Sequence, residues 1–251
     1  MARQRTPDGP PPPPSVQKLR IRYAKRGRLR FSSTRDFARA LERALRRAGV
    51  PMAFSAGFHP HPLISYANAA PTGTASEAEY FEIRVTERVD PDSVREALDD
   101  ALPSGLDVLE VVEAGPGTLA DRLEASEWRL EVRGADPSAL EDAVTAYLAC
   151  DVAEATRTFK TGPRTFDTRA AVVAMAVTEV DEEGCAILRV VVRHTTPSVR
   201  PDDILTALRA VTGFSPPVPP LVTRLAQGPL TDAAAGVADP LAADKDAAGS
   251  G

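Results

Sequence analysis

The chain of 251 residues is poor in the residue types on which several kinds of site depend. It has two cysteines, three histidines and 5% aromatic residues, and Cys150 and Cys185 show no CxxC spacing. No apolar run reaches the eighteen or so residues that a membrane span requires. These absences predict reduced thiols instead of a disulfide scaffold, and a cytoplasmic protein with no membrane partner.

Motifs typical of common enzymes are absent as well. The sequence contains no CxxxCxxC for a radical SAM iron–sulfur cluster, no P-loop, no GxGxxG after a strand, no HExxH and no GxSxG. We therefore expect no bound cofactor, and any radical chemistry would have to come from another chain.

Both ends of the chain are expected to be disordered. Residues 1–15 contain the tract Pro10–Pro14, have no apolar signal core and favour an extended conformation. Residues 228–251 consist mainly of Ala, Asp and Gly, with few large apolar side chains. The folded part should lie between about Val16 and Gln227.

Within that part the apolar period switches repeatedly between two and 3.6 residues, which predicts an α+β protein of two tandem ferredoxin-like βαββαβ units, at 16–115 and 125–227. The first unit would have strands at 18–24, 52–54, 63–67, 79–86 and 106–112, and helices at 35–48 and 91–102. The second would have strands at 128–133, 152–160, 172–180, 185–193 and 218–225, and helices at 137–148 and 201–211. Residues 119–123 would form a short linking helix.

A basic cluster stands in the first quarter of the chain. Between Ser15 and Tyr66 there are twelve Lys or Arg and two acids, a net charge of +10, whereas the whole chain carries −5. A local excess of this size creates a positive field that attracts anions, above all a nucleic-acid backbone. A solvated basic surface without a ligand is the simpler alternative.

The same region resembles a known family. The phrases RIRYAKRGRLRFSS, ALERALRRAGVP, FSAGFHPHPLISYANAAPTG and SEAEYFEI are similar to those of the DUF2344 family, and the resemblance covers roughly residues 16–227. Its members are radical-SAM-associated proteins, fused to a radical SAM protein or encoded beside one. The resemblance therefore implies a radical SAM protein as partner. Many relatives have His where this chain has Ser33, so a catalytic base at that position would be missing.

The arginines of the first expected strand and helix would lie largely on one face of each element. Guanidinium groups pair with phosphate in a bidentate manner, so these faces suit an RNA backbone. A second basic segment, FKTGPRTFDTR at 159–169, flanks a Gly-Pro turn, and a plain turn with solvated ends is its alternative interpretation. The predicted nucleic-acid-binding residues are Arg20, Arg22, Arg26, Arg28, Arg39, Arg43, Arg46, Arg47, Lys160 and Arg164.

Aromatic residues interleaved with the basic ones would stack on unpaired bases, or else belong to the core. They are Phe31, Phe54, Phe58 and Tyr66.

The long loop at 55–80 carries the candidate catalytic residues. His59 and His61 form an H-P-H segment that would contact phosphate or act as acid and base, but no nearby Cys completes a metal site, so we expect no metal. Glu77, Glu79 and Glu82 are either salt-bridge partners of the arginines or site carboxylates, and Glu79 is the candidate of interest.

The sequence thus favours an accessory protein that binds RNA, or an RNA–protein substrate, beside a radical SAM enzyme, over an enzyme in its own right. Two alternatives stay open. One is a metal-free RNA-processing or RNA-modifying enzyme that uses His59 or His61, and the other is a purely protein-binding adaptor.

Overall fold

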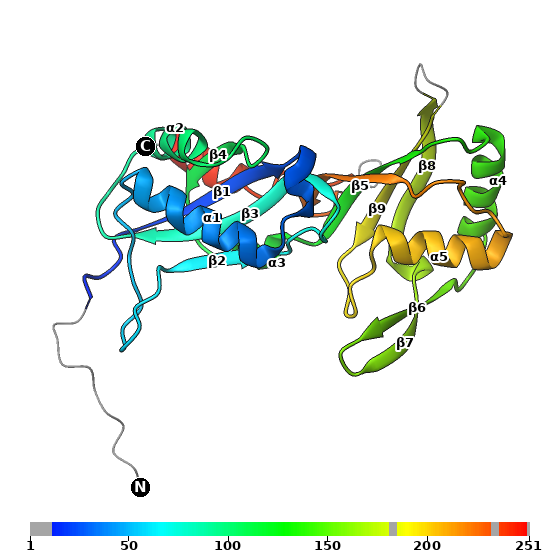
Figure 1. The fold of residues 1–251 in the computed structure, drawn as a ribbon, viewed down its shortest axis with the longest axis horizontal. Coiled ribbons are helices and arrows are strands. Elements are labelled where there is room, and N and C mark those ends of the chain that lie inside the picture. The colour runs from blue at the N-terminus through cyan, green and yellow to red at the C-terminus, as the bar shows by residue number, and fades with distance from the viewer. Residues whose placement is uncertain (1–11, 181–184, 232–235, 250–251) are drawn as a thin grey trace, which may run out of the picture. The chain divides into compact units, whose positions relative to one another are not determined.

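The computed structural model describes residues 12–180, 185–231 and 236–249. The chain is an α+β protein that divides into two compact units (Figure 1). Unit 1 consists of Met1–Ala120 with Leu241–Gly251, and unit 2 consists of Asp121–Pro240. The boundary falls close to the one expected, but unit 1 also takes in the C-terminal segment.

Unit 1 is built on an antiparallel sheet. The strand order is β4-β1-β3-β2, and each neighbouring pair is antiparallel. Alternation along β1 buries Leu19, Ile21 and Tyr23 against the helices α1 and α2, and this forms the core of the unit. The elements are β1 (Gln17–Lys25), the 3-10 turn η1 (Gly27–Phe31), α1 (Thr34–Arg47), β2 (Ile64–Ala67), β3 (Ala75–Val85), α2 (Pro91–Ala101) and β4 (Val108–Glu113).

In unit 2 four antiparallel strands follow the order β10-β5-β9-β8. The helices α4 and α5 bury Leu140, Tyr147 and Leu208 with the apolar residues of these strands. The elements are β5 (Ala125–Val132), α4 (Pro137–Leu148), β6 (Glu154–Phe159), β7 (Gly162–Asp167), the 3-10 turn η2 (Arg169–Ala171), β8 (Val172–Val180), β9 (Ala186–Arg193), α5 (Pro201–Thr212) and β10 (Leu221–Gly228). The expected linking helix is α3 (Leu119–Arg122).

The segment at 152–160 was expected to be a strand of the second sheet, and the structure corrects this. It forms β6, which pairs with β7 in a separate two-stranded sheet, and β7 was not predicted. The physical reason is the lack of a buried face, because the side chains of both strands are mostly exposed or half-buried.

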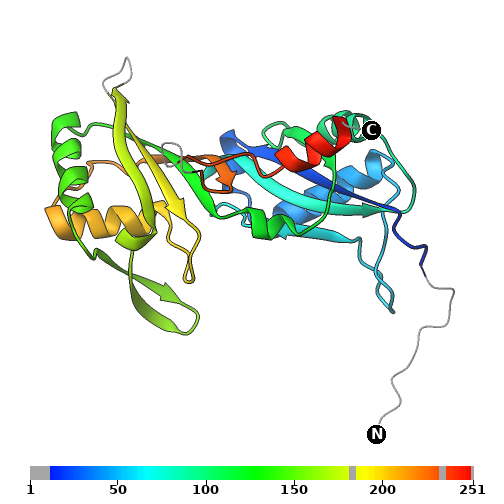
Figure 2. The same cartoon turned by 180° about the vertical axis from the view of Figure 1, so that it is seen from behind.

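The C-terminal segment differs from the expected disordered tail. Residues Ala242–Gly249 form the helix α6, which Figure 2 shows in red beside the other elements of unit 1. The helix has little apolar surface, so periodicity gave no sign of it. A buried carboxylate, Asp244, attaches it to the sheet instead.

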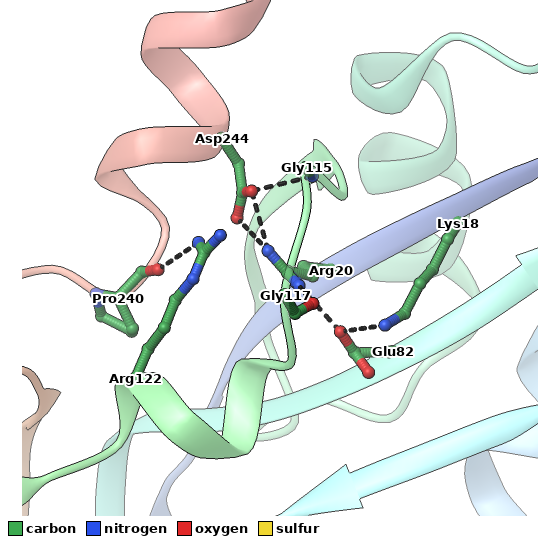
Figure 3. A network of polar contacts seen from close by, with 8 residues as sticks. All are labelled: Lys18, Arg20, Glu82, Gly115, Gly117, Arg122, Pro240 and Asp244. Atoms are coloured by element: carbon green, nitrogen blue, oxygen red, sulfur yellow. Dashed lines mark hydrogen bonds and ion pairs between the residues drawn. The ribbon is translucent and has the colours of Figure 1, made fainter.

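Asp244 contacts Arg20 of β1, and neither side chain is exposed to solvent (Figure 3). The Arg20 guanidinium donates to both oxygens of Asp244 at 2.8 and 2.9 Å, to Glu82 at 2.9 Å and to the Gly117 carbonyl at 2.7 Å. Burial lowers the pKa of Arg20, but the hydrogen bonds to Asp244 and Glu82 outweigh it and raise the pKa overall. The backbone N–H of Gly115 also donates to Asp244, at 2.8 Å. Together these contacts compensate the buried positive charge of Arg20.

Among the described residues no helix is long and apolar enough to cross a membrane.

We predict that Asp244→Ala destabilises the protein by about 3 kcal/mol, because the buried Arg20 guanidinium loses the carboxylate that accepts two of its hydrogen bonds and keeps only part of its compensation, from Glu82 and the Gly117 carbonyl. Urea denaturation of the full chain measures this loss. Asp246→Ala is the matched control, since Asp246 is an exposed carboxylate of the same helix. Equal free energies of unfolding for the two variants would show that α6 does not depend on this ion pair.

Candidate nucleic-acid interface

Local sequence signals explain where the helix α1 begins and ends. Ser33 is the N-cap: its side chain accepts a hydrogen bond from the Asp36 N–H at 3.2 Å, and the Asp36 side chain accepts from the Ser33 N–H at 3.3 Å. The hydrogen bonds from Ser33 lower the pKa of Asp36. Gly49, with φ of 65°, follows the helix in the left-handed region that favours glycine. Ser33 therefore has a structural role as the N-cap of α1.

The exposed side of α1 carries a row of arginines. At about 100° per residue, they point away from the buried side chains Phe37, Leu41 and Ala44. All are exposed, and in the described part of the chain none of them forms an ion pair. The row extends over about 16 Å of helix. We call it the α1 arginine face; its members are Arg35, Arg39, Arg43 and Arg46.

Arg47 lies at the edge of this face and donates to the Ala101 carbonyl at 3.2 Å. Arg28, on η1, is exposed. Arg35 was not among the predicted contacts, although its spacing of four residues from Arg39 was a sufficient signal.

The arginines of β1 are arranged differently. Arg20 is completely buried in the network with Asp244 and Glu82, so it leaves the set of candidate contact residues. Arg22 is half-buried and donates to the Glu77 carbonyl at 2.9 Å. Arg26 is paired with Glu77 and with Asp107.

The acids that neutralise β1 come from neighbouring strands and from α6. Arg20 lies opposite Glu82 in the register of β1 with β3, and Lys18 pairs with the same carboxylate at 2.6 Å. Glu77 and Glu82 are thus salt-bridge partners of basic residues, which was the simpler interpretation of these acids. The pairing leaves the strand with little free positive charge, in contrast to α1.

Glu79, the third candidate catalytic residue, is buried beside the loop between β2 and β3. It is 1% exposed and accepts hydrogen bonds from the Ala70 N–H at 3.1 and 3.3 Å. Lys25, also buried, donates to the carbonyls of Ala70 and Pro71 at 3.2 and 3.4 Å. These contacts hold the loop between β2 and β3, and the cavity beside them is only about 20 Å³.

The segment between α1 and β2 forms a projecting arm, residues 53–63, drawn in light blue in Figure 1. Two backbone hydrogen bonds close it, Leu63 N–H to Ala53 carbonyl and Ser55 N–H to His61 carbonyl, both at 2.8 Å. His59 and His61 are exposed near its tip. The described residues contain no group of three or more His, Cys, Asp or Glu side chains able to hold a metal ion.

The interleaved aromatic residues are partly solvent-exposed, although aromatics of this kind commonly belong to a core. Phe58 at the arm tip is 62% exposed and Phe54 at the arm base is 44% exposed. Phe31 beside Arg30 is 59% exposed, and Tyr66, whose ring packs on Phe37, is 37% exposed. Exposed rings next to basic side chains are the combination that stacks on unpaired bases.

In unit 2 the predicted residues Lys160 and Arg164 are exposed on the β6–β7 hairpin. The Arg164 guanidinium lies 5.5 Å from the ring centre of Phe159, and Arg157 lies 4.7 Å from the same ring. Arg157 is paired with Asp203, whereas Lys160 and Arg164 are exposed basic side chains of this hairpin.

The described part of the chain thus combines an α+β fold with a row of exposed arginines and several exposed aromatic side chains. A family model described as "Uncharacterized protein conserved in bacteria (DUF2344)" matches residues 18–201, and the chain belongs to this family. No curated protein matches it. One similar solved structure is a chain of the "Crystal Structure of a Cbf5-Nop10-Gar1 Complex", at 11% identity and a TM-score of 0.44. The similarity covers 89% of this chain and 55% of that one, so this chain spans about half the length of that protein.

We predict that replacing His59 and His61 together by Ala changes the free energy of unfolding by no more than about 0.5 kcal/mol, because both side chains are exposed. Glu79→Ala should cost about 1–3 kcal/mol, since it leaves the buried Ala70 N–H without its acceptor. Chemical denaturation compares the two variants. A loss of more than about 1 kcal/mol in the histidine variant would contradict the exposed position of the arm.

Proposed function

We propose that this protein is an RNA-binding accessory protein of a radical SAM enzyme, and that the α1 arginine face binds the RNA backbone. The observation that carries the proposal is the contrast between two sets of arginines in one unit. Arg20 of β1 and Arg26 directly after it are paired with acids, whereas the four members of the α1 arginine face are exposed and form no ion pair among the described residues. A charge that the fold does not compensate is available to a ligand.

The spacing of the face supports a polyanion as that ligand. Four guanidinium groups over about 16 Å suit several successive phosphates better than a single small anion. The exposed Phe31, Phe54 and Phe58 add rings that stack on unpaired bases, which favours single-stranded RNA. Lys160 and Arg164 supply a further basic contact on the β6–β7 hairpin.

We further infer that both units are ferredoxin-like. In chain order the four sheet strands of each unit are arranged 4-1-3-2, with helices after the first and third strands. This is the arrangement of a βαββαβ unit, and the β6–β7 hairpin is then an insertion in the second one.

The radical SAM partner follows from the family resemblance, and the lack of a CxxxCxxC motif in this chain is consistent with a division of labour between two proteins. We place both in the cytoplasm. A pull-down from the native host, with RNA sequenced and proteins identified together, tests this part of the proposal. Recovery of neither RNA nor a radical SAM protein would contradict it.

A metal-free RNA-cleaving enzyme is the second candidate, because His59 and His61 are both exposed on the arm. Incubation of RNA with the protein and a chelator separates the two functions. We expect intact RNA. Fragments ending in a cyclic phosphate, lost in the double histidine variant, would favour the enzyme.

We predict that replacing Arg39, Arg43 and Arg46 by Gln weakens binding of single-stranded RNA and reduces the slope of log K against log salt by about two, because each lost phosphate contact removes about 0.7 from the slope. Fluorescence anisotropy with labelled RNA over a series of salt concentrations measures both quantities.

The matched control replaces Arg88, Arg95 and Arg209 by Gln, which changes the net charge by the same three units at residues outside the face. This variant should retain the affinity and the slope of the unaltered protein. If the two triple variants behave alike, binding is a non-specific charge effect, and if neither protein nor variant binds RNA, a protein-binding adaptor becomes the better proposal.

A further inference from the structure

A cavity of about 320 Å³ lies where the last turn of α1 meets the base of the arm. Its size is at the lower end of that of small-molecule sites. The lining residues come from α1, from the arm and from the segment that joins them, and include Glu42, Leu45, Arg46, Val50, Met52 and Phe54. All belong to unit 1.

The lining combines apolar side chains with two charged ones. Leu45 is buried, and Val50 and Met52 are half-buried, so the inner surface is aliphatic and sulfur-containing. Phe54 is 44% exposed and offers a ring that is large and only partly covered. Glu42 and Arg46 are exposed and add one carboxylate and one guanidinium. This combination suits a planar, largely apolar ligand that carries hydrogen-bonding groups on its edge.

The cavity adjoins the α1 arginine face, because Arg46 belongs to both. Arg43 lies three residues earlier, about 4.5 Å along the helix axis. A ligand whose planar part enters the cavity therefore has two guanidinium groups within reach of an anionic part. A nucleotide has this construction: an aromatic base, with a phosphate one sugar away.

We propose that this cavity binds one unpaired nucleobase, whose phosphate is held by Arg43 and Arg46. The base stacks on Phe54 and contacts Met52, and the carboxylate of Glu42 accepts a hydrogen bond from an amino group on the base edge. The inference rests on the proposed RNA binding, and it adds a site that distinguishes RNA from other polyanions.

The methionines provide a direct test in the full chain. The sequence has three, of which Met52 lines the cavity and Met175 belongs to the core of unit 2. With methyl-labelled methionine, adenosine 5′-monophosphate at millimolar concentration should shift the Met52 signal, because a stacked base imposes a ring current on it. The Met175 signal should stay in place. Ribose 5-phosphate, which has the phosphate and lacks the base, should leave Met52 nearly unchanged.

Two variants test whether the shift of the Met52 signal arises from a base bound in the cavity. Phe54→Ala should abolish most of the Met52 shift, whereas Val152→Ala, which removes an exposed apolar side chain of unit 2 outside the cavity, should retain it. In single-stranded RNA, Phe54→Ala should lower the affinity roughly ten-fold, and it should have no effect on an oligomer that lacks bases.

The outcomes distinguish this inference from the proposed function. RNA binding that depends on the arginine face, with a Met52 signal that ignores the nucleotide or responds equally to ribose 5-phosphate, overturns the base site alone. A nucleotide-dependent shift of Met52 without any affinity for RNA overturns the proposed RNA binding and leaves a site for a small nucleotide.

Discussion

Unit 1 depends on the compensation of one buried charge, the guanidinium of Arg20. This side chain stands on the sheet face opposite the apolar core and is completely enclosed. An isolated charge in that position costs several kcal/mol, so the fold needs partners there. Glu82 on the neighbouring strand and Asp244 on α6 supply them, and the same contacts attach the C-terminal helix to a strand more than two hundred residues earlier in the chain.

The arginines of α1 differ from Arg20 because no neighbouring strand places an acid opposite them in the described structure. The sheet has adjacent strands that place acids opposite the basic residues of β1, and the register pairs Arg20 with Glu82. The outward side of α1 has no such neighbour among the described elements. Its buried stripe fixes the helix against the core, and the opposite stripe is left to solvent and to a ligand.

Much of this fold could be predicted from local patterns. The alternating apolar residues at 18–24 predicted β1, and the helical apolar period at 35–48 predicted α1. The burial and pairing of Arg20 could not be predicted, because its partners depend on the register of the strands and on a helix without an apolar stripe. For the same reason the sequence grouped the arginines of β1 and α1 as one basic surface. The exposure of Phe54 and the cavity beside it could not be predicted from the sequence either. The periodicity of apolar residues does not distinguish a short strand from a projecting arm.

Photocrosslinking tests the central claim most directly, because it reports which residues the RNA contacts. Single-stranded RNA containing 4-thiouridine is crosslinked to the full chain, and the attached peptides are identified by mass spectrometry. Our account predicts crosslinks within residues 35–62, the α1 arginine face and the arm, with further ones on the β6–β7 hairpin at 154–167. Crosslinks concentrated on β1 and β4, or elsewhere in unit 2, would contradict it.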